Sequence, residues 1–462
     1  MKKLHILFLF SIAILSSCSE EPIFVEDPFV VAFKETSGQL LEIENQKEIA
    51  LVYSEAATED GTLRIQINTE NALYGRDFVT IPAAINNELS LSISVNETET
   101  NFQIVELNNS FTDVMKITFL IASVEIENSN IQGYASHQLS DSSHLGGTFL
   151  ATVGGPNEPN QVYIDLSSNK ETLIRRNAWD LGFYAGDEFR VVINGSLYMA
   201  TSALETTDIN TVNSATVSSL KSMVAVGTFN PDNKAYVDAV NGNILETAIG
   251  EISEDDSQNP VYLLNLGADV GTTQPPTGSI AIAGDARGWK KIRILRQGNG
   301  YKLQYADLDA TSYNEVSIAK DTDFNFTFFS FNTDEIVSVE PQKLQWDICF
   351  TVFTNVIPNA GSYGFSDFVI HNRKGGVTSY SLLDSAVSYE DFNASNVDTT
   401  LLKENQTVIG SSWRDVFKRK VNTNIFYVLE DSNNNYYKIR FLDLVDGNGE
   451  RGYPRFEYTL LQ

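Results

Sequence analysis

The sequence predicts an all-β protein made of several sandwich modules, and three observations lead to this prediction. Segments in which apolar and polar residues alternate are numerous, whereas apolar residues at helical spacing are few. Turn clusters such as Asp60-Gly61 and Gly298-Asn299-Gly300 separate these segments. The chain has 462 residues, enough for about two to four packed domains. The predicted strands are residues 29–33, 62–67, 89–95, 101–106, 116–124, 162–166, 189–193, 291–295, 301–305, 324–331, 426–429 and 437–442.

Charge and composition exclude several classes of protein. The chain carries 32 Lys and Arg against 60 Asp and Glu, and apart from Lys418-Arg419-Lys420 it has no basic run longer than two residues. Nucleic-acid binding is therefore not expected, because it depends on clustered cations. Two cysteines and four histidines are too few for a disulfide scaffold or a zinc site of the usual spacing. The expected class is a large, acidic, globular protein.

The N-terminus has the form of a bacterial export signal. Lys2 and Lys3 precede a mostly apolar stretch, residues 4–15, that is too short to span a membrane. The following Leu15-Ser16-Ser17-Cys18 resembles a lipobox, which implies that residues 1–17 are removed and that Cys18 carries acyl chains. Ser19-Glu20-Glu21 resembles the surface-export signal of Bacteroidetes lipoproteins. We therefore expect a protein lipid-anchored in the outer membrane and exposed on the cell surface.

Residues 24–135 are predicted to form the first module, an immunoglobulin-like (Ig) sandwich of about seven short strands. Within it, Tyr74-Gly75-Arg76-Asp77-Phe78 resembles the Calx-β (Calx-beta) family. That resemblance implies a calcium site built from carboxylates at one end of the sandwich, although a spacer without calcium is the preferred interpretation. The carboxylates available for calcium are those of Glu42, Glu44, Glu59, Asp60 and Asp77.

An internal repeat occupies the rest of the chain. The block Trp179-Asp180-Leu181-Gly182-Phe183 recurs as Trp346-Asp347-Ile348-Cys349-Phe350. Two further pairs of blocks follow in the same order, 191–204 with 368–382 and 292–308 with 426–444. The first copy is longer, and we expect its extra chain between Ala203 and Gly284. Segment 324–331 is matched to 456–461, so it is predicted to close the first copy while also opening the second.

These repeated blocks resemble the HmuY-like lipoproteins of Bacteroidetes. The resemblance covers roughly residues 145–462 and includes the loop 372–379 and the terminal segment 449–458. It implies two tandem HmuY-like β modules, at 145–331 and 324–462, after the Ig/Calx-beta-like sandwich. It also implies haem binding in a cleft by two axial side chains, either a His pair or a Met pair. In that family the haem passes to a TonB-dependent outer-membrane transporter.

The predicted haem ligands are Met199 and Met223 of the first copy. Iron in haem takes one imidazole nitrogen or thioether sulfur on each face, inside an apolar slot. Met199 lies in the loop after strand 189–193, where the resemblance implies the first donor. Met223 follows 24 residues later, which is within the separation that the resemblance implies for the second donor. The alternative is that both methionines fill the core. His371 of the second copy has no later His or Met as partner, and it is expected to be a surface or loop histidine.

The predicted function is capture of haem, from haem itself or haem proteins, and its transfer to a transporter, without catalysis. The sequence has no nucleophile elbow, zincin motif, P-loop or dinucleotide-binding fingerprint. Two other classes stay open, a surface glycan-binding lipoprotein and an adhesin with no small ligand. Exposed paired aromatic rings would favour sugar, whereas an apolar slot flanked by both methionines would favour haem. The aromatic candidates for stacking on sugar are Tyr198, Tyr236, Trp289 and Tyr380.

Overall fold

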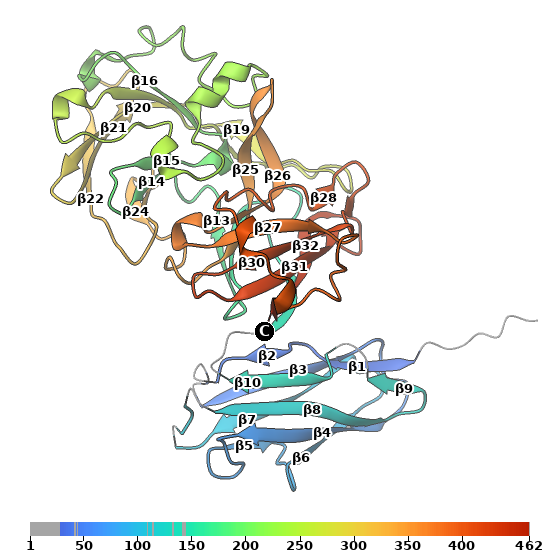
Figure 1. The fold of residues 1–462 in the computed structure, drawn as a ribbon. Helices are drawn as coiled ribbons and strands as arrows, with labels where there is room; N and C mark the ends of the chain where they lie inside the picture. Colours follow the sequence, from blue (N-terminus) through green and yellow to red (C-terminus); the bar gives the residue numbers. More distant parts are fainter. Residues whose placement is uncertain are drawn as a thin grey trace, which may run out of the picture.

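The structure, a computed structural model, describes residues 28–40, 43, 45–108, 110–112, 115–131, 134–140 and 145–461 (Figure 1). Cys18 and the predicted signal peptide lie outside these residues, as do two of the candidate calcium ligands, Glu42 and Glu44. The described chain is built from strands and short 3-10 turns, so the predicted all-β class is confirmed. No helix in the described part has the length and apolar character that crossing a membrane requires.

The first module is a sandwich of two five-stranded sheets, drawn in blue to cyan in Figure 1. Alternation along the strands places one face of each sheet in the core, as Leu63, Ile65 and Ile67 show within a single strand. One sheet has the order β5 (Phe78–Ile81), β7 (Glu99–Glu106), β3 (Gln46–Tyr53), β1 (Phe29–Phe33) and β9 (Ser129–Ile131). The other has the order β2 (Ser37–Gly38), β10 (Ser136–Ser140), β8 (Lys116–Glu125), β4 (Gly61–Glu70) and β6 (Glu88–Ile93).

The last strand of this sandwich, β10, lies beyond the predicted end of the module at residue 135. It pairs antiparallel with β8, with His137 opposite Phe119. The sequence places His137 in the connector before the first repeat, where a solvated linker is the simplest interpretation, and this interpretation is wrong. The ring is buried beside Phe33, and its Nδ1 lies 2.8 Å from the carbonyl oxygen of Glu35. The alternation that buries Leu139 of β10 therefore buries this histidine as well.

The two repeats contain equivalent strands in the same order. Each starts with a hairpin, continues with a Trp-Asp pair and a second hairpin, and ends with a multistranded sheet. The first repeat comprises β12 (Asn160–Asp165), β13 (Lys170–Arg175), β14 (Leu181–Tyr184), β15 (Val191–Ile193), β16 (Ala200–Ala203), β17 (Val261–Asn265), β18 (Ala268–Val270), β19 (Ala283–Ala286), β20 (Trp289–Gln297), β21 (Gly300–Asp307) and β22 (Asn314–Ile318). The second comprises β23 (Phe326–Ser330), β24 (Glu335–Val337), β25 (Ile348–Ile357), β26 (Gly361–His371), β27 (Thr378–Leu383), β28 (Arg414–Asp415), β29 (Lys420–Val421), β30 (Ile425–Glu430), β31 (Tyr436–Val445) and β32 (Arg451–Leu461).

The opening hairpins of the two repeats are exchanged. Hairpin β12–β13 joins the second repeat, in the sheet order β13-β12-β25-β26, with Val162 opposite Phe350. Hairpin β23–β24 joins the first repeat, in the sheet order β15-β14-β23-β24, with Leu181 opposite Phe329. Each of these four-stranded sheets therefore contains strands from both repeats, and the repeats are interlocked although they are consecutive in sequence.

The strand that closes the first repeat also differs from the prediction. In the second repeat, the closing strand β32 pairs with β31. Because segment 324–331 is matched to 456–461, the sequence predicts that segment 324–331 pairs in the same way with β21 of the first repeat. The structure places β22 beside β21 instead. Segment 324–331 forms β23, which opens the second repeat in sequence and pairs with β14 of the first. The prediction that segment 324–331 closes the first repeat is therefore wrong, because two apolar strands with similar sequences can belong to different sheets.

The longer first repeat contains an insert, residues 204–260, in the region where extra chain is expected. It has no strand and forms only short 3-10 turns, each begun by an Asn or Asp side chain that accepts a backbone N–H. Most of its buried apolar residues pack with those of β16 and β17 in a separate buried cluster, whereas Ile249 and Ile252 belong to the main core of the first repeat. The 3-10 turns of the chain are η1 (Gly195–Leu197), η2 (Ile209–Thr211), η3 (Pro231–Tyr236), η4 (Ile244–Glu246), η5 (Asp256–Gln258), η6 (Arg373–Gly375), η7 (Ala394–Asn396) and η8 (Thr399–Leu401).

Candidate binding site between the repeats

A cavity of about 170 Å³ lies where the exchanged hairpins meet, and we call it the seam cavity. Trp179 and Trp346, the equivalent tryptophans of the two repeats, both line it. Further lining residues come from the insert, over 237–247, and from β23 and β26. The exposed surface of its walls is mostly apolar, with a few polar groups, which is typical of ligand sites.

The two tryptophans differ in their hydrogen bonds. Trp179 donates its Nε1–H to Oε1 of Gln161 over 2.8 Å. The Nε1–H of Trp346 is buried and has no acceptor among the described residues. A buried donor without an acceptor is costly, on the order of 1–3 kcal/mol. Trp346 therefore lines the cavity with its Nε1–H enclosed and without an acceptor among the described residues, and a ligand atom could reach this donor only after the neighbouring groups move.

Two acids, Asp238 and Glu340, and two cations, Arg373 and Lys374, line the seam cavity. Asp238 accepts the backbone N–H groups of Ile193 and Ala248, each over 2.9 Å. Glu340 accepts those of Asn325 and Phe326. Burial raises the pKa of Asp238 to about 6 and that of Glu340 to about 7.

Lys374 is the cation that interacts with both of these acids. Its Nζ donates to the carbonyl oxygen of Gly242 over 3.2 Å and lies 5.3 Å from the ring centre of Phe326. Burial lowers its pKa to about 8, although Glu340 and Asp238 favour its charged form. Sequence analysis did not identify these three residues, because isolated acids and a Lys in a loop carry no motif.

We expect the protein to lose stability between pH 5 and pH 7.5, partly through Glu340. The folded pKa of Glu340 is above the unfolded value near 4.5, so the folded state holds more protons between pH 4.5 and 7. The contribution of Glu340 to the free energy of unfolding is therefore fully present below pH 4.5 and is lost as the pH rises through 7. The expected loss is on the order of 1–3 kcal/mol. His371, with a pKa lowered by burial to about 4, acts in the opposite direction between pH 4 and 6.5.

Urea unfolding of the Glu340→Gln variant at both pH values checks this expectation. Gln keeps an oxygen for the two backbone N–H groups but cannot ionise, so the variant should lose less stability than the parent between pH 5 and 7.5. Glu335→Gln, at an exposed position on β24, is the matched control and should keep the parental slope. An unchanged slope in Glu340→Gln would contradict the assignment.

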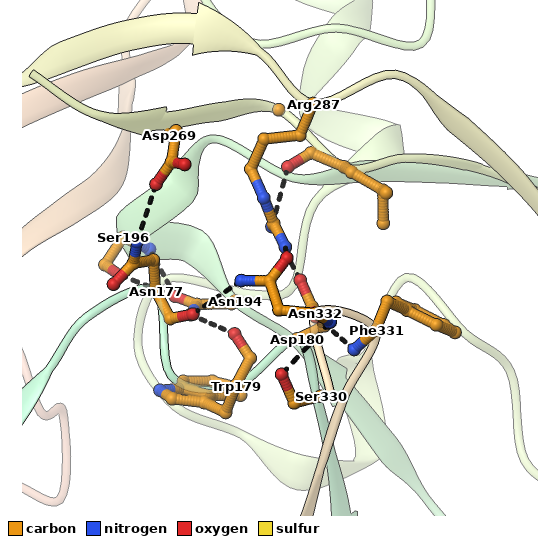
Figure 2. A network of polar contacts seen from close by, with 12 residues as sticks. Asn177, Trp179, Asp180, Asn194, Ser196, Asp269, Arg287, Ser330, Phe331 and Asn332 are labelled. Carbon is orange, nitrogen blue, oxygen red and sulfur yellow. Dashed lines mark hydrogen bonds and ion pairs between the residues drawn. The ribbon is translucent and has the colours of Figure 1, made fainter. Parts of the chain in front are cut away.

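A largely buried polar network adjoins Trp179 and joins three strands (Figure 2). Asn194 donates from its Nδ2 to the carbonyl oxygens of Arg176 and Trp179, over 2.7 and 2.8 Å. Asp180 accepts from Nη1 of Arg287 and from the backbone N–H of Phe331, both over 2.6 Å. Both side chains of the Asp180–Arg287 ion pair are buried. The network thus holds β14, β15 and β23 together next to the cavity.

The second repeat has the same network without the arginine. Asn372 donates from its Nδ2 to the carbonyl oxygens of Lys343 and Trp346, over 2.8 and 2.9 Å. Asp347 accepts the backbone N–H of Leu166 over 2.8 Å, and it has no ion pair in the described part of the chain. Burial raises the pKa of Asp347 well above its usual value. The Trp-Asp blocks of the sequence are therefore structural, and each one fixes the hairpin exchanged from the other repeat.

The structure places the two predicted haem ligands differently. Met199 is fully buried and lines the seam cavity. Met223 is 39% exposed and does not line it. Their chain segments are close, because Asn265, which pairs with Ala200, donates to the carbonyl oxygen of Val224 over 2.9 Å.

Neighbouring residues show that Met199 and the segment that carries Met223 lie on opposite faces of the sheet. Ala200 and Val224 share one buried cluster, whereas Met199 belongs to the cluster on the other face. In this conformation the sheet separates the segment that carries Met223 from the side chain of Met199. The structure therefore does not bring the two sulfurs together at one cavity.

His371 is buried at the end of β26, which corrects the expectation of a surface or loop histidine. Its Nδ1 lies 2.9 Å from Oγ of Ser379, and its Nε2 lies 3.2 Å from the carbonyl oxygen of Glu404. The residue lines the seam cavity, but both ring nitrogens already have partners. An iron ligand would require one of these contacts to break.

The aromatic residues predicted to stack on sugar do not form an exposed platform. Tyr380 is buried, and Tyr236 and Trp289 pack against the cluster beneath the insert. Tyr198 is partly buried, with its ring against Gly364 of β26. A different pair is exposed instead. Phe229 (68% exposed) and Tyr363 (41%) lie with their ring centres 5.5 Å apart. Sequence analysis missed them because neither residue is in a motif and the pair joins the insert to β26.

The first module shows no calcium centre among its described residues. Asp77 is buried and pairs with Arg76 over 2.6 Å. Glu59 and Asp60 accept backbone N–H groups of Glu127 and Val95. Across the described chain, no group of three or more His, Cys, Asp or Glu side chains is placed to hold a metal ion.

Comparison with known proteins gives one family match. The family model described as HmuY protein matches residues 157–317 and 322–458. No curated protein matches the sequence. Similar solved structures include the apo form of the Calx CBD1 domain, at 14% identity over 24% of this chain and 96% of that chain, with a TM-score of 0.20. They also include a HmuY-like heme binding protein from Bacteroides vulgatus, at 9% identity over 68% of this chain and 91% of that chain, with a TM-score of 0.15. A lipoprotein from Bacteroides fragilis matches at 8% identity over 68% of this chain and 90% of that chain, with a TM-score of 0.15.

Proposed function

Since the family match covers both repeats, the chain belongs to the HmuY family, and from this membership we propose that it binds haem at the seam cavity. In this proposal Cys18 anchors the protein in the outer membrane, at the cell surface. Haem is taken from the surroundings or from haem proteins and is passed to a TonB-dependent transporter. The protein binds its cargo and does not change it chemically.

The observation that carries the proposal is the position of Met199. Its sulfur is one of the soft, neutral donors that haem iron accepts, and it lines a mostly apolar cavity beside two tryptophans. Arg373 and Lys374 line the same cavity and supply cations for the carboxylates of a porphyrin. Met199 thus suits the iron of haem, the two tryptophans suit its flat apolar ring, and the two cations suit its carboxylates.

Haem does not fit the seam cavity without movement of the insert. About 170 Å³ is less than the roughly 300–1,000 Å³ of pockets that hold drug-sized ligands. The wall formed by 237–247 belongs to the same insert as Met223. We therefore propose that displacement of the insert, which contains no strand, both enlarges the cavity and brings Met223 to the second face of the iron.

Titration of haemin into the chain from Ser19 onward, followed at the Soret band in both oxidation states, tests the proposal. The expected result is a saturable shift near one equivalent. The double variant Met199→Leu with Met223→Leu should lose this shift, because leucine keeps the volume of methionine but has no sulfur. Met115→Leu, in the core of the first module, is the matched control and should bind like the parent.

Other outcomes of the titration have definite meanings. A shift that survives both methionine changes but is lost in His371→Ala would transfer the iron ligand to the second repeat and contradict the proposed pair. A flat titration at micromolar protein would remove the haem proposal. Glycan binding would then become the first candidate, because Phe229 and Tyr363 form an exposed aromatic pair.

A further inference from the structure

The basic run of the sequence forms the tip of a small hairpin. Strands β28 and β29 pair through Arg414 with Val421 and through Asp415 with Lys420. The four residues from Phe417 to Lys420 are all exposed, and Phe417 is 97% exposed. We call Phe417, Lys418, Arg419 and Lys420 the basic tip.

Trp413, just before the hairpin, and Asp415, at its start, fix the conformation of the basic tip. Oδ1 of Asp415 accepts the backbone N–H groups of Phe417 and Lys418, each over 3.0 Å. Trp413, which precedes the hairpin, is fully buried and donates its Nε1–H to the carbonyl oxygen of Asp367 over 3.1 Å. An anchored turn thus presents a phenylalanine ring to water, at the cost of leaving apolar surface exposed.

The charge of the basic tip is opposite to that of the whole chain. The formal net charge is −28, and no other run of three cations occurs in the sequence. One acid lies within the hairpin, since Asp415 pairs with Lys418 over 3.1 Å. The adjacent loop 272–279, which approaches Arg419 at Gly278, contains no charged residue. Arg419 and Lys420 form no ion pair with an acid in the described part of the chain, in contrast to Lys418.

We propose that the basic tip is a contact site for an anionic phospholipid surface. An exposed aromatic ring beside clustered Lys and Arg is the combination that binds at a membrane interface, the ring entering the headgroup layer and the cations pairing with phosphates. The acidic remainder of the chain is repelled by the same surface, so the tip determines which part of the protein approaches the bilayer. This site is separate from the seam cavity and does not depend on haem.

Sedimentation with vesicles tests the proposal, using the chain from Ser19 onward. Vesicles of phosphatidylcholine with about a third of phosphatidylglycerol should bind the protein at low salt, and pure phosphatidylcholine vesicles should bind it weakly. Changing Lys418, Arg419 and Lys420 to Ser should lower the partition coefficient about tenfold to a hundredfold, since each cation near the surface contributes about 1 kcal/mol. The matched control changes three exposed lysines elsewhere, Lys34, Lys234 and Lys403, to Ser and should have a smaller effect.

Insertion of the aromatic ring is tested separately. A Phe417→Cys variant labelled with an environment-sensitive dye should brighten on anionic vesicles, whereas Leu344→Cys, at a position 54% exposed, should not. The buried Cys349 is not expected to take the label in the folded protein. Equal binding by the tip variant and the parent, or equal losses in tip and control variants, would overturn the proposal. The proposal would also be overturned if the basic tip bound an acidic protein but did not bind the anionic vesicles.

Discussion

Replacing Arg287 with methionine is expected to lower the free energy of unfolding by about 3 kcal/mol, within the range for breaking a buried ion pair. The change leaves the buried carboxylate of Asp180 without its cation. It also removes two further hydrogen bonds, from Nη2 of Arg287 to Asn332 and from Nη1 to the carbonyl oxygen of Leu266. Methionine keeps much of the apolar contact of the arginine stem, so lost packing contributes little. Urea unfolding monitored by tryptophan fluorescence measures the loss.

Two further variants separate the ion pair from other effects of the change. Adding Asp180→Asn to Arg287→Met should recover part of the loss, because the neutral amide can still accept the N–H of Phe331. Arg455→Met removes a half-exposed partner of Asp443 and should cost less than about 1 kcal/mol. An Arg287→Met loss as small as that of Arg455→Met would show that the buried pair is not required.

Neither repeat is expected to fold when it is produced alone. A fragment ending at residue 321 lacks β23, which pairs with β14, and a fragment starting at 322 lacks β12, which pairs with β25. Each would expose the edge of a central strand and the buried residues of the seam. We expect fragments 145–321 and 322–462 to show no cooperative unfolding separately and to form a stable complex when they are produced together.

Thermal unfolding and proton NMR of the separate and combined fragments check this expectation. Dispersed spectra and a sharp transition for one fragment alone would mean that its own opening hairpin can replace the exchanged one. That result would contradict an obligatory exchange. Residues 145–462 without the first module provide the control, because they contain both repeats and should unfold cooperatively.

The strand content of the protein was predictable from local pattern. The alternation in β4 places Leu63, Ile65 and Ile67 on one face, and a sheet can bury that face without further information. The repeat was also predictable, because the block that begins with Trp179-Asp180 recurs at Trp346-Asp347. The role of these blocks was not predictable. In the structure they occupy the same position in equivalent networks, and each holds the hairpin exchanged from the other repeat.

The candidate site was only partly predictable. The family resemblance implies a first donor near Met199, and this residue lines the cavity. The resemblance also implies a second donor at a separation that fits Met223, but separation along a chain does not determine which face of a sheet a loop covers. Asp238 and Glu340 acquire raised pKa values from burial, and burial is a property of the assembled fold.

The sequence by itself determined the all-β class, the duplicated segments and the family, because all three depend on residue types at fixed short spacings. Only the tertiary structure decided that hairpins β12–β13 and β23–β24 are exchanged. Strand pairing uses backbone N–H and C=O groups that every residue has, so two similar hairpins can satisfy either sheet. Chain connectivity and the packing of both sheets at once select one arrangement, and this arrangement creates the cavity between the repeats.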